Sequence, residues 1–173
     1  MSSPLELRLA KIAPARAVVN LAALRHNGRV LKQAAEDLGA KMMAVVKADA
    51  YGHGVVQASS AFIEAGINAF AVATLAEGVE LREGLRKLGY NDEIVILIFG
   101  APTPADVEFL IEYALDTHVT SVPVARAIVN ELNSGRHSQQ IQLRTHICVE
   151  TGMMRVGCRP EEATEVWKTL KEC

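Results

Sequence analysis

A lysine that closes an apolar segment is the residue of this chain best suited to chemistry. Lys47 follows the apolar residues 44–46 and opens a turn that carries Tyr51, His53 and two glycines. A strand of this kind delivers its last residue to the carboxyl edge of a sheet, where α/β proteins hold their active sites. An apolar wall there favours the neutral amine, which can form a Schiff base with an aldehyde cofactor such as pyridoxal phosphate.

The residues after Lys47 add a possible anion site. Tyr51 offers a phenol, and Gly52 and Gly54 allow backbone N–H groups to approach a phosphate. The same residues also allow an ordinary interpretation, in which Lys47 extends its amine from a strand end into solvent and Tyr51 is a surface ring. The chemistry of these residues alone leaves both interpretations open.

Five short segments rich in β-branched or apolar residues recur at intervals of roughly 25 residues, the length of a strand, two loops and a helix. They begin near Met42, Ala69, Ile94, Thr117 and Leu143. Continuous apolar runs such as residues 94–99 are typical of parallel strands buried on both faces. The sequence therefore predicts five βα units.

Helix-start signals lie between these segments. Thr74 and Glu77 have the spacing of a capping box. Three prolines suit the first turns of helices, namely Pro104, Pro123 and Pro160. We expect the helix that begins at Pro104 to continue to Ala114.

Two further elements are predicted ahead of the first βα unit, and the number of units leaves two architectures open. Residues 17–21 predict a short strand, and Asn20 is a candidate N-cap for a helix through Leu38. A βα repeat can close into an eight-unit barrel or form an open, doubly wound sheet of the Rossmann or flavodoxin type. A barrel needs about 250 residues, whereas this chain has 173.

Four motifs resemble the pyridoxal-phosphate-dependent alanine racemases. The string VVKADAYGHG at residues 45–54 is similar to the family's cofactor-lysine motif, and residues 146–157 are similar to its strand ending in Asp-Thr-Gly-Met-x-Arg-x-Gly. Residues 18–27 resemble its opening strand and helix, and residues 73–84 give a weaker match. The resemblance covers residues 15–162. It implies an α/β fold: a pyridoxal-phosphate-binding TIM (β/α)8-type barrel, incomplete, with about five βα units.

The resemblance implies roles for three residues. Lys47 corresponds to the lysine that binds pyridoxal phosphate as an internal Schiff base and then moves the substrate α-proton on one face. Tyr51 would hydrogen-bond the cofactor phosphate. Arg155 would contact the cofactor's phenolic oxygen and the substrate carboxylate, for which its planar fork is suited. The implied reaction interconverts L-alanine and D-alanine. We expect His53 to order its turn and His146 to point into the barrel, neither as a catalyst.

Departures from the family pattern limit these expectations. Cys148 stands where many members have a lysine that helps to hold the arginine, so Arg155 would need another orienting partner. Glu150 replaces the usual aspartate. We find no counterpart in this sequence of the family's β-rich C-terminal domain. The tyrosine that the second subunit contributes as the base on the opposite face has no counterpart either. We therefore expect residues 1–173 to be a partial barrel domain of a longer product that needs the missing part for activity. Homodimers would belong to the full-length form.

The composition excludes several other classes. A net charge of −2 gives no basic field for nucleic acid. No apolar run approaches the roughly 18 residues of a membrane span, and residues 1–11 lack the apolar core of a signal peptide. Cys148, Cys158 and Cys173 show no CxxC spacing, so we expect neither a metal site nor a disulfide framework. We expect these thiols to be incidental or buried and the protein to be cytoplasmic.

Several functions compete with the leading interpretation. One is a non-catalytic, pyridoxal-phosphate-binding remnant barrel that keeps the lysine without turnover, and single-domain cofactor-homeostasis proteins share this barrel. Another is a racemase for a different small amino acid, such as serine. A flavodoxin-like binding module would make the lysine motif coincidental.

Overall fold

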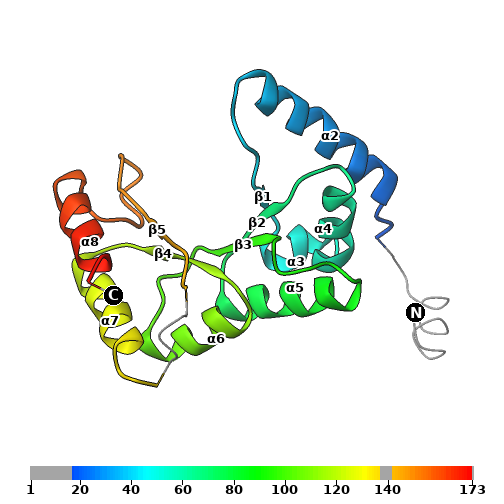
Figure 1. Ribbon diagram of the computed structural model, residues 1–173. Helices are drawn as coiled ribbons and strands as arrows, with labels where there is room; N and C mark the ends of the chain where they lie inside the picture. Colours follow the sequence, from blue (N-terminus) through cyan, green and yellow to red (C-terminus); the bar gives the residue numbers. More distant parts are fainter. Residues whose placement is uncertain (1–16, 137–141, 173) are drawn as a thin grey trace.

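Five parallel strands form one sheet in the order of the chain (Figure 1). The computed structural model describes residues 17–136 and 142–172. The strands are β1 (Ala44–Val45), β2 (Ala69–Val72), β3 (Val95–Ile98), β4 (Asp116–Val119) and β5 (Thr145–Ile147), paired as β1-β2-β3-β4-β5. A doubly wound sheet reverses its strand order, whereas a barrel keeps it. The unbroken order therefore confirms five βα units of the incomplete barrel type.

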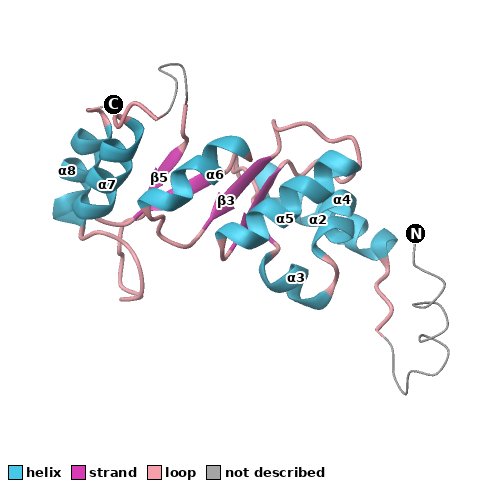
Figure 2. Cartoon of the chain, turned by 90° about the horizontal axis from the view of Figure 1, so that it is seen from below, coloured by secondary structure: helices cyan, strands magenta, loops and turns pink. Residues whose placement is uncertain are grey.

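The helices alternate with the strands. They are α2 (Leu21–Asp37), α3 (Lys47–Gly52), α4 (Val55–Ile63), α5 (Leu75–Lys87), α6 (Val107–Glu112), α7 (Val122–Leu132) and α8 (Ala163–Leu170), with short 3₁₀ turns η1 (Pro104–Asp106) and η2 (Pro160–Glu162). Figure 2 shows α2, α4 and α5 at one end of the sheet and α7 and α8 at the other. No helix within the described residues is both long and apolar enough to cross a bilayer.

Most of the predicted helix starts are confirmed. Asn20 caps α2, because its Oδ1 accepts the Ala23 N–H at 3.1 Å. Thr74 and Glu77 form the full capping box of α5. A proline stands in the first turn of η1, α7 and η2, as expected.

Two boundary predictions were wrong. Residues 17–20 form no strand, since Asn20 already serves the first turn of α2 and no described strand pairs with this segment. The helix expected from Pro104 to Ala114 begins as a 3₁₀ turn and ends at Glu112. It ends there because Ala114 takes a left-handed conformation, with φ 48°, which a right-handed helix cannot continue.

The register of the strands divides the sheet into two faces. Val72, Ile98, Thr117 and Thr145 form one row of neighbours, and they lie on the face covered by helices. Val45, Ala71, Leu97 and Asp116 form a row on the opposite face, which in a closed barrel is the interior. That face is buried at the central strands, but Val45 on the outer strand β1 is 41% exposed.

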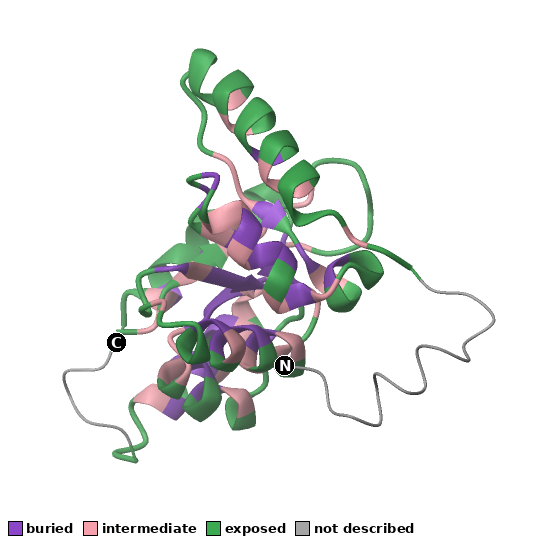
Figure 3. Ribbon diagram, turned by 90° about the vertical axis from the view of Figure 1, so that its right-hand side faces the viewer, coloured by how far each residue is buried: buried purple, intermediate pink, exposed green. Residues whose placement is uncertain are grey.

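Burial concentrates in two apolar clusters. The larger joins β1, β2 and β3 to α4 and α5 through residues such as Phe70, Leu81 and Ile96. The smaller joins β4 to α7 and α8 through Val119, Ile128 and Val166. Helix α2 is largely exposed, as Figure 3 shows, and it meets the larger cluster at Gly28, where an added Cβ would lie 3.0 Å from the Phe62 ring.

A buried arginine fastens α5 to the chain that leads into β4. Arg82 is fully buried, and its guanidinium donates to the carbonyls of Ile94 at 2.7 Å, Tyr113 at 2.8 Å and Ala114 at 2.9 Å. Burial lowers the pKa of Arg82, although nearby Asp92 opposes that shift. The side chain thus supplies donors to carbonyls just before β3 and just after α6.

We expect Arg82→Met to destabilise the fold by about 3 kcal/mol or more, because it leaves these buried or part-buried carbonyls without their charged donor. The free energy of unfolding in urea measures this. Lys87→Met, on an exposed position of the same helix, is the matched control and should change little. Equal stability of the two variants would contradict a structural role for Arg82.

Candidate active site

A hollow at the carboxyl ends of the strands brings the predicted lysine and arginine together. It has a volume of about 470 Å³. Its lining residues are Lys47, Ala73, Phe99, Gly100, His118, Cys148, Val149, Glu150, Thr151, Met153, Arg155 and Val156. Ala73 and Phe99 directly follow β2 and β3, and Lys47 lies two residues after β1, so continuation of the sheet register places the three side by side. The site therefore depends on segments that are far apart in the sequence.

The turn after Lys47 is a left-handed helical turn. Residues 48–51 all have φ between 52° and 54° and ψ between 40° and 54°. Each L-residue in this conformation costs roughly 1–2 kcal/mol, and none of the four is glycine. Strained backbone of this kind persists only where the surroundings enforce it, and it gathers at functional sites. The sequence indicated a turn but not its hand.

Asp49 and His53 close this turn. The Asp49 carboxylate accepts the Val55 N–H at 2.7 Å, and the Asp49 carbonyl accepts the Gly54 N–H at 3.0 Å. The Asp49 carboxylate thus serves the first turn of α4. His53 Nδ1 lies 2.8 Å from the Ala50 carbonyl oxygen, which confirms that this histidine orders the loop.

Glu77 fixes the other side of the same turn. Its Oε1 accepts the Ala48 N–H at 2.8 Å, and its Oε2 accepts the N–H groups of Ala73 at 2.7 Å and Thr74 at 3.1 Å. Burial acts to raise the pKa of the Glu77 carboxyl, but these hydrogen bonds and the charge of Lys47 outweigh it and hold the pKa below its usual value. Glu77 was predicted only as a helix cap, and its reach to Ala48 had no signal in the sequence.

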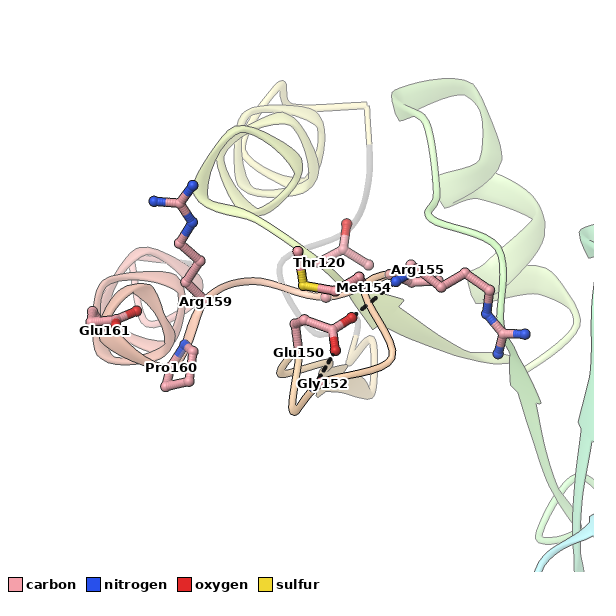
Figure 4. A pocket seen from close by; sticks show the side chains of 10 residues that line it. Thr120, Glu150, Gly152, Met154, Arg155, Arg159, Pro160 and Glu161 are labelled. Atoms are coloured by element: carbon pink, nitrogen blue, oxygen red, sulfur yellow. Dashed lines mark hydrogen bonds between the residues drawn. The ribbon is translucent and has the colours of Figure 1, made fainter.

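Glu150 organises the loop that carries Arg155. Its carboxylate accepts the N–H groups of Gly152 at 2.6 Å and Arg155 at 3.0 Å. Hydrogen bonds from the amides of Met154, Gly152 and Arg155 lower the pKa of Glu150. Figure 4 shows the Arg155 side chain extending away from this carboxylate. Glu150 therefore orients the arginine through its backbone, and Arg155 also borders a second hollow of about 600 Å³.

The remaining predicted residues lie at different distances from the hollow. Tyr51 is 61% exposed and is not among the residues that line it. Cys148 lines the hollow, with its Sγ 3.8 Å from the Val156 carbonyl oxygen. Cys158 is buried, and burial raises the pKa of its thiol. Cys173 lies outside the described residues. Within those residues, no group of three or more His, Cys, Asp or Glu side chains is placed to hold a metal ion.

Two histidines lie on the interior face of β4 and β5. His118 and His146 are register neighbours with ring centroids 6.5 Å apart, and His118 also contacts the Phe99 ring at 5.5 Å. The buried Asp116 carboxylate lies 2.9 Å from His146 Nε2 and accepts from Arg144 Nε at 2.8 Å. His146 thus shares the interior face, as predicted. Burial, and next the neighbouring His146, lower the pKa of His118.

This shift predicts a loss of stability in mild acid. Because the folded state holds the pKa of His118 below its value of 6.5 in the unfolded chain, the unfolded state binds the proton first. The stability that comes from keeping His118 neutral in the folded state is fully present above about pH 6.5. It is lost as the pH falls towards the pKa of His118 in the folded state. Urea unfolding of wild type between about pH 7.5 and about pH 5.5 should show the decrease.

His118→Gln should have a smaller decrease over this interval than wild type. The exposed His26 on α2 provides the matched control, and His26→Gln should follow wild type. An unchanged pH dependence in His118→Gln would rule out the assigned shift.

Comparison with known proteins places this lysine-bearing barrel segment in a family. The model of the alanine racemase N-terminal domain matches residues 19–173, so the chain belongs to the alanine racemase N-terminal domain family. An alanine racemase of Carboxydothermus hydrogenoformans is 37% identical over 158 residues. That alignment covers 91% of this chain and 40% of the relative. The chain therefore spans about 40% of the length of such relatives.

Solved structures give the same relationship. The crystal structure of alanine racemase from Corynebacterium glutamicum is 35% identical, with a TM-score of 0.71, and the match covers 88% of this chain and 40% of that one. A histidine racemase from Leuconostoc mesenteroides subsp. sake is 27% identical, with a TM-score of 0.74, and the match covers 92% of this chain and 41% of that one.

Proposed function

We propose that this chain binds pyridoxal phosphate through Lys47 and forms one side of the active site of an amino-acid racemase that interconverts L-alanine and D-alanine. The observation that carries the proposal is that Lys47 and Arg155 line one hollow. The family's alanine racemases support both the reaction and the cofactor. This chain covers about 40% of such a relative. We therefore propose that turnover also needs the part of those proteins that this chain does not match.

The residues present suit the cofactor. The hollow lies within the usual range of ligand sites, about 300–1,000 Å³. It offers a primary amine for an aldehyde and a guanidinium for an oxyanion. Tyr51 lies on the strained turn after Lys47, outside the lining of the hollow, and we propose that its exposed phenol would bind the phosphate.

The cofactor and the side chains of the hollow would have separate roles in the reaction. Pyridoxal phosphate, when bound, supplies an aldehyde for attachment and a ring that withdraws electrons from the substrate α-carbon. Lys47 Nζ is the attachment point and then the base that takes the α-proton from one face. Arg155 binds the substrate carboxylate, and Glu150 holds the loop from which it extends. The base for the opposite face would come from outside this chain.

The partners and location follow from the same proposal. The substrate is a small amino acid, alanine first. Cys148 and Cys158 are free thiols, which supports a reducing compartment such as the cytoplasm. A homodimer would belong to the full-length form.

We expect pyridoxal phosphate followed by borohydride to label Lys47 in the folded chain, with mass spectrometry of the digested protein as the measurement. Lys47→Ala should lose the label and the visible absorbance band of the conjugate. Lys41→Ala, which removes an exposed lysine just before β1, should keep both. Folded wild type without a label at position 47 would overturn the proposal.

We expect Arg155→Lys to weaken binding of L-alanine to the cofactor-loaded chain by about 10- to 100-fold. An ammonium cannot reproduce the two parallel bonds of a guanidinium to a carboxylate, and charged hydrogen bonds contribute about 1.5–3 kcal/mol. Titration of the visible absorbance with L-alanine measures this. Arg159→Lys, on the same loop, is the control. Equal affinities would remove Arg155 from the substrate site.

A second candidate substrate has a specific basis, the match to a histidine racemase with a TM-score of 0.74. The same titration with L-histidine and L-serine decides between them. If L-histidine or L-serine binds more tightly than L-alanine, that amino acid replaces L-alanine as the proposed substrate. The proposal that Lys47 binds pyridoxal phosphate would be unaffected.

A further inference from the structure

Lys47 is held by a hydrogen bond on each side of its own backbone. On the strand side, the Val46 N–H donates to the Ala71 carbonyl at 2.8 Å, which continues the pairing of β1 with β2. On the turn side, the Ala48 N–H donates to Glu77 Oε1 at 2.8 Å. The Ala48 N–H belongs to the peptide unit that follows the Lys47 Cα, so its direction sets the ψ angle of Lys47. Glu77 therefore helps to determine where the lysine side chain starts.

Glu77 is itself held in place by further hydrogen bonds. Glu77 lies in the first turn of α5, and its second oxygen accepts the N–H groups of Ala73 and Thr74 at the end of β2. The carboxylate thus joins three N–H groups from two neighbouring strand ends. Its negative charge is also favourable at a helix N-terminus. A side chain fixed in this way can hold a strained turn in one conformation.

We propose that Glu77 is a positioning residue that fixes the direction in which Lys47 presents its amine to the hollow. The inference rests on the proposed function of Lys47. It goes beyond the helix-capping role, since a capping box needs only the bonds between Thr74 and Glu77 and does not involve Ala48.

The chemistry of the side chain makes this testable. Both carboxylate oxygens accept, one from Ala48 and the other from Ala73 and Thr74. Glutamine has one acceptor oxygen, and its NH₂ group would face an N–H donor on the other side. Glu77→Gln therefore cannot satisfy both sides at once. Glu77→Asp keeps the charge but is one methylene too short to span them.

Thr74→Ala is the matched control. It removes the hydroxyl that accepts the Glu77 N–H at 3.2 Å, which is the other half of the capping box. It leaves the bond between Ala48 and Glu77 in place. Both variants weaken the start of α5, but only Glu77→Gln releases the turn after Lys47.

The experiment uses the full chain and two readouts. Hydrogen exchange at the Ala48 amide, without cofactor, should become about tenfold faster in Glu77→Gln, the effect of losing roughly 1.4 kcal/mol of hydrogen bonding. After loading with pyridoxal phosphate, the visible circular dichroism per unit of absorbance should fall, because the conjugate is less firmly oriented. Thr74→Ala should lower the melting temperature yet keep both signals. Glu77→Asp should repeat the losses, and it replaces Glu77→Gln if that variant does not fold.

The outcomes separate the two proposals. A wild-type conjugate at Lys47 together with unaltered exchange and dichroism in Glu77→Gln would overturn the positioning role alone. Equal losses in Thr74→Ala would also overturn it, because they would trace the effect to the helix start. Absence of any conjugate in wild type would overturn the proposed function, and the positioning role with it.

Discussion

The candidate site depends on a left-handed turn that the surrounding carboxylates hold in place. Four consecutive L-residues after Lys47 take this conformation, although each favours the right-handed one by roughly 1–2 kcal/mol. Glu77 accepts at the start of the turn and Asp49 accepts at its end. Hydrogen bonds to charged acceptors contribute about 1.5–3 kcal/mol each, which is the size needed to offset such a cost. The turn begins after Lys47, two residues beyond the end of β1, and leads the chain into α4.

The repeating pattern of the fold could be predicted from the sequence because strands buried on both faces are continuous apolar runs. The segments near Ala69 and Ile94 became β2 and β3, and Asn20, Thr74 and the prolines marked helix starts correctly. Residues 17–21 show where this reasoning fails. Val18 and Val19 favour a strand, but a strand also needs a partner, and local composition carries no information about pairing.

The site was predictable only in part for a related reason. Lys47 and Arg155 could be proposed from their motifs, but their meeting on one hollow depends on the register of five strands. The left-handed turn had no local signal, since positive φ angles are normally marked by glycine. Glu77 carried the pattern of a helix cap, and its contact with Ala48 joins segments 29 residues apart.

The open interior face limits how firmly five units can hold this site. A closed barrel covers that face and has no edge strands, whereas β1 and β5 here each pair with one neighbour among the described strands. Val45 and His146 on these outer strands are both exposed. Apolar area left in water forgoes about 25 cal/mol per Å². The central strands therefore contribute most of the stability, whereas the proposed groups lie beyond the ends of the outer strands, Lys47 two residues after β1 and Arg155 eight residues after β5.

The two proposed groups also follow strands that belong to different apolar clusters. Lys47 extends from the cluster built on β1, β2 and β3, and Arg155 follows β5 in the cluster built on β4, α7 and α8. The strands of these clusters meet where β3 pairs with β4, a ladder of two register pairs. Contact between the Phe99 and His118 rings supports this junction on the interior face. On the helical face, Arg82 binds carbonyls at the entrance to β4. This short junction therefore contributes to the separation of amine and guanidinium, and its Phe99 and His118 rings line the same hollow.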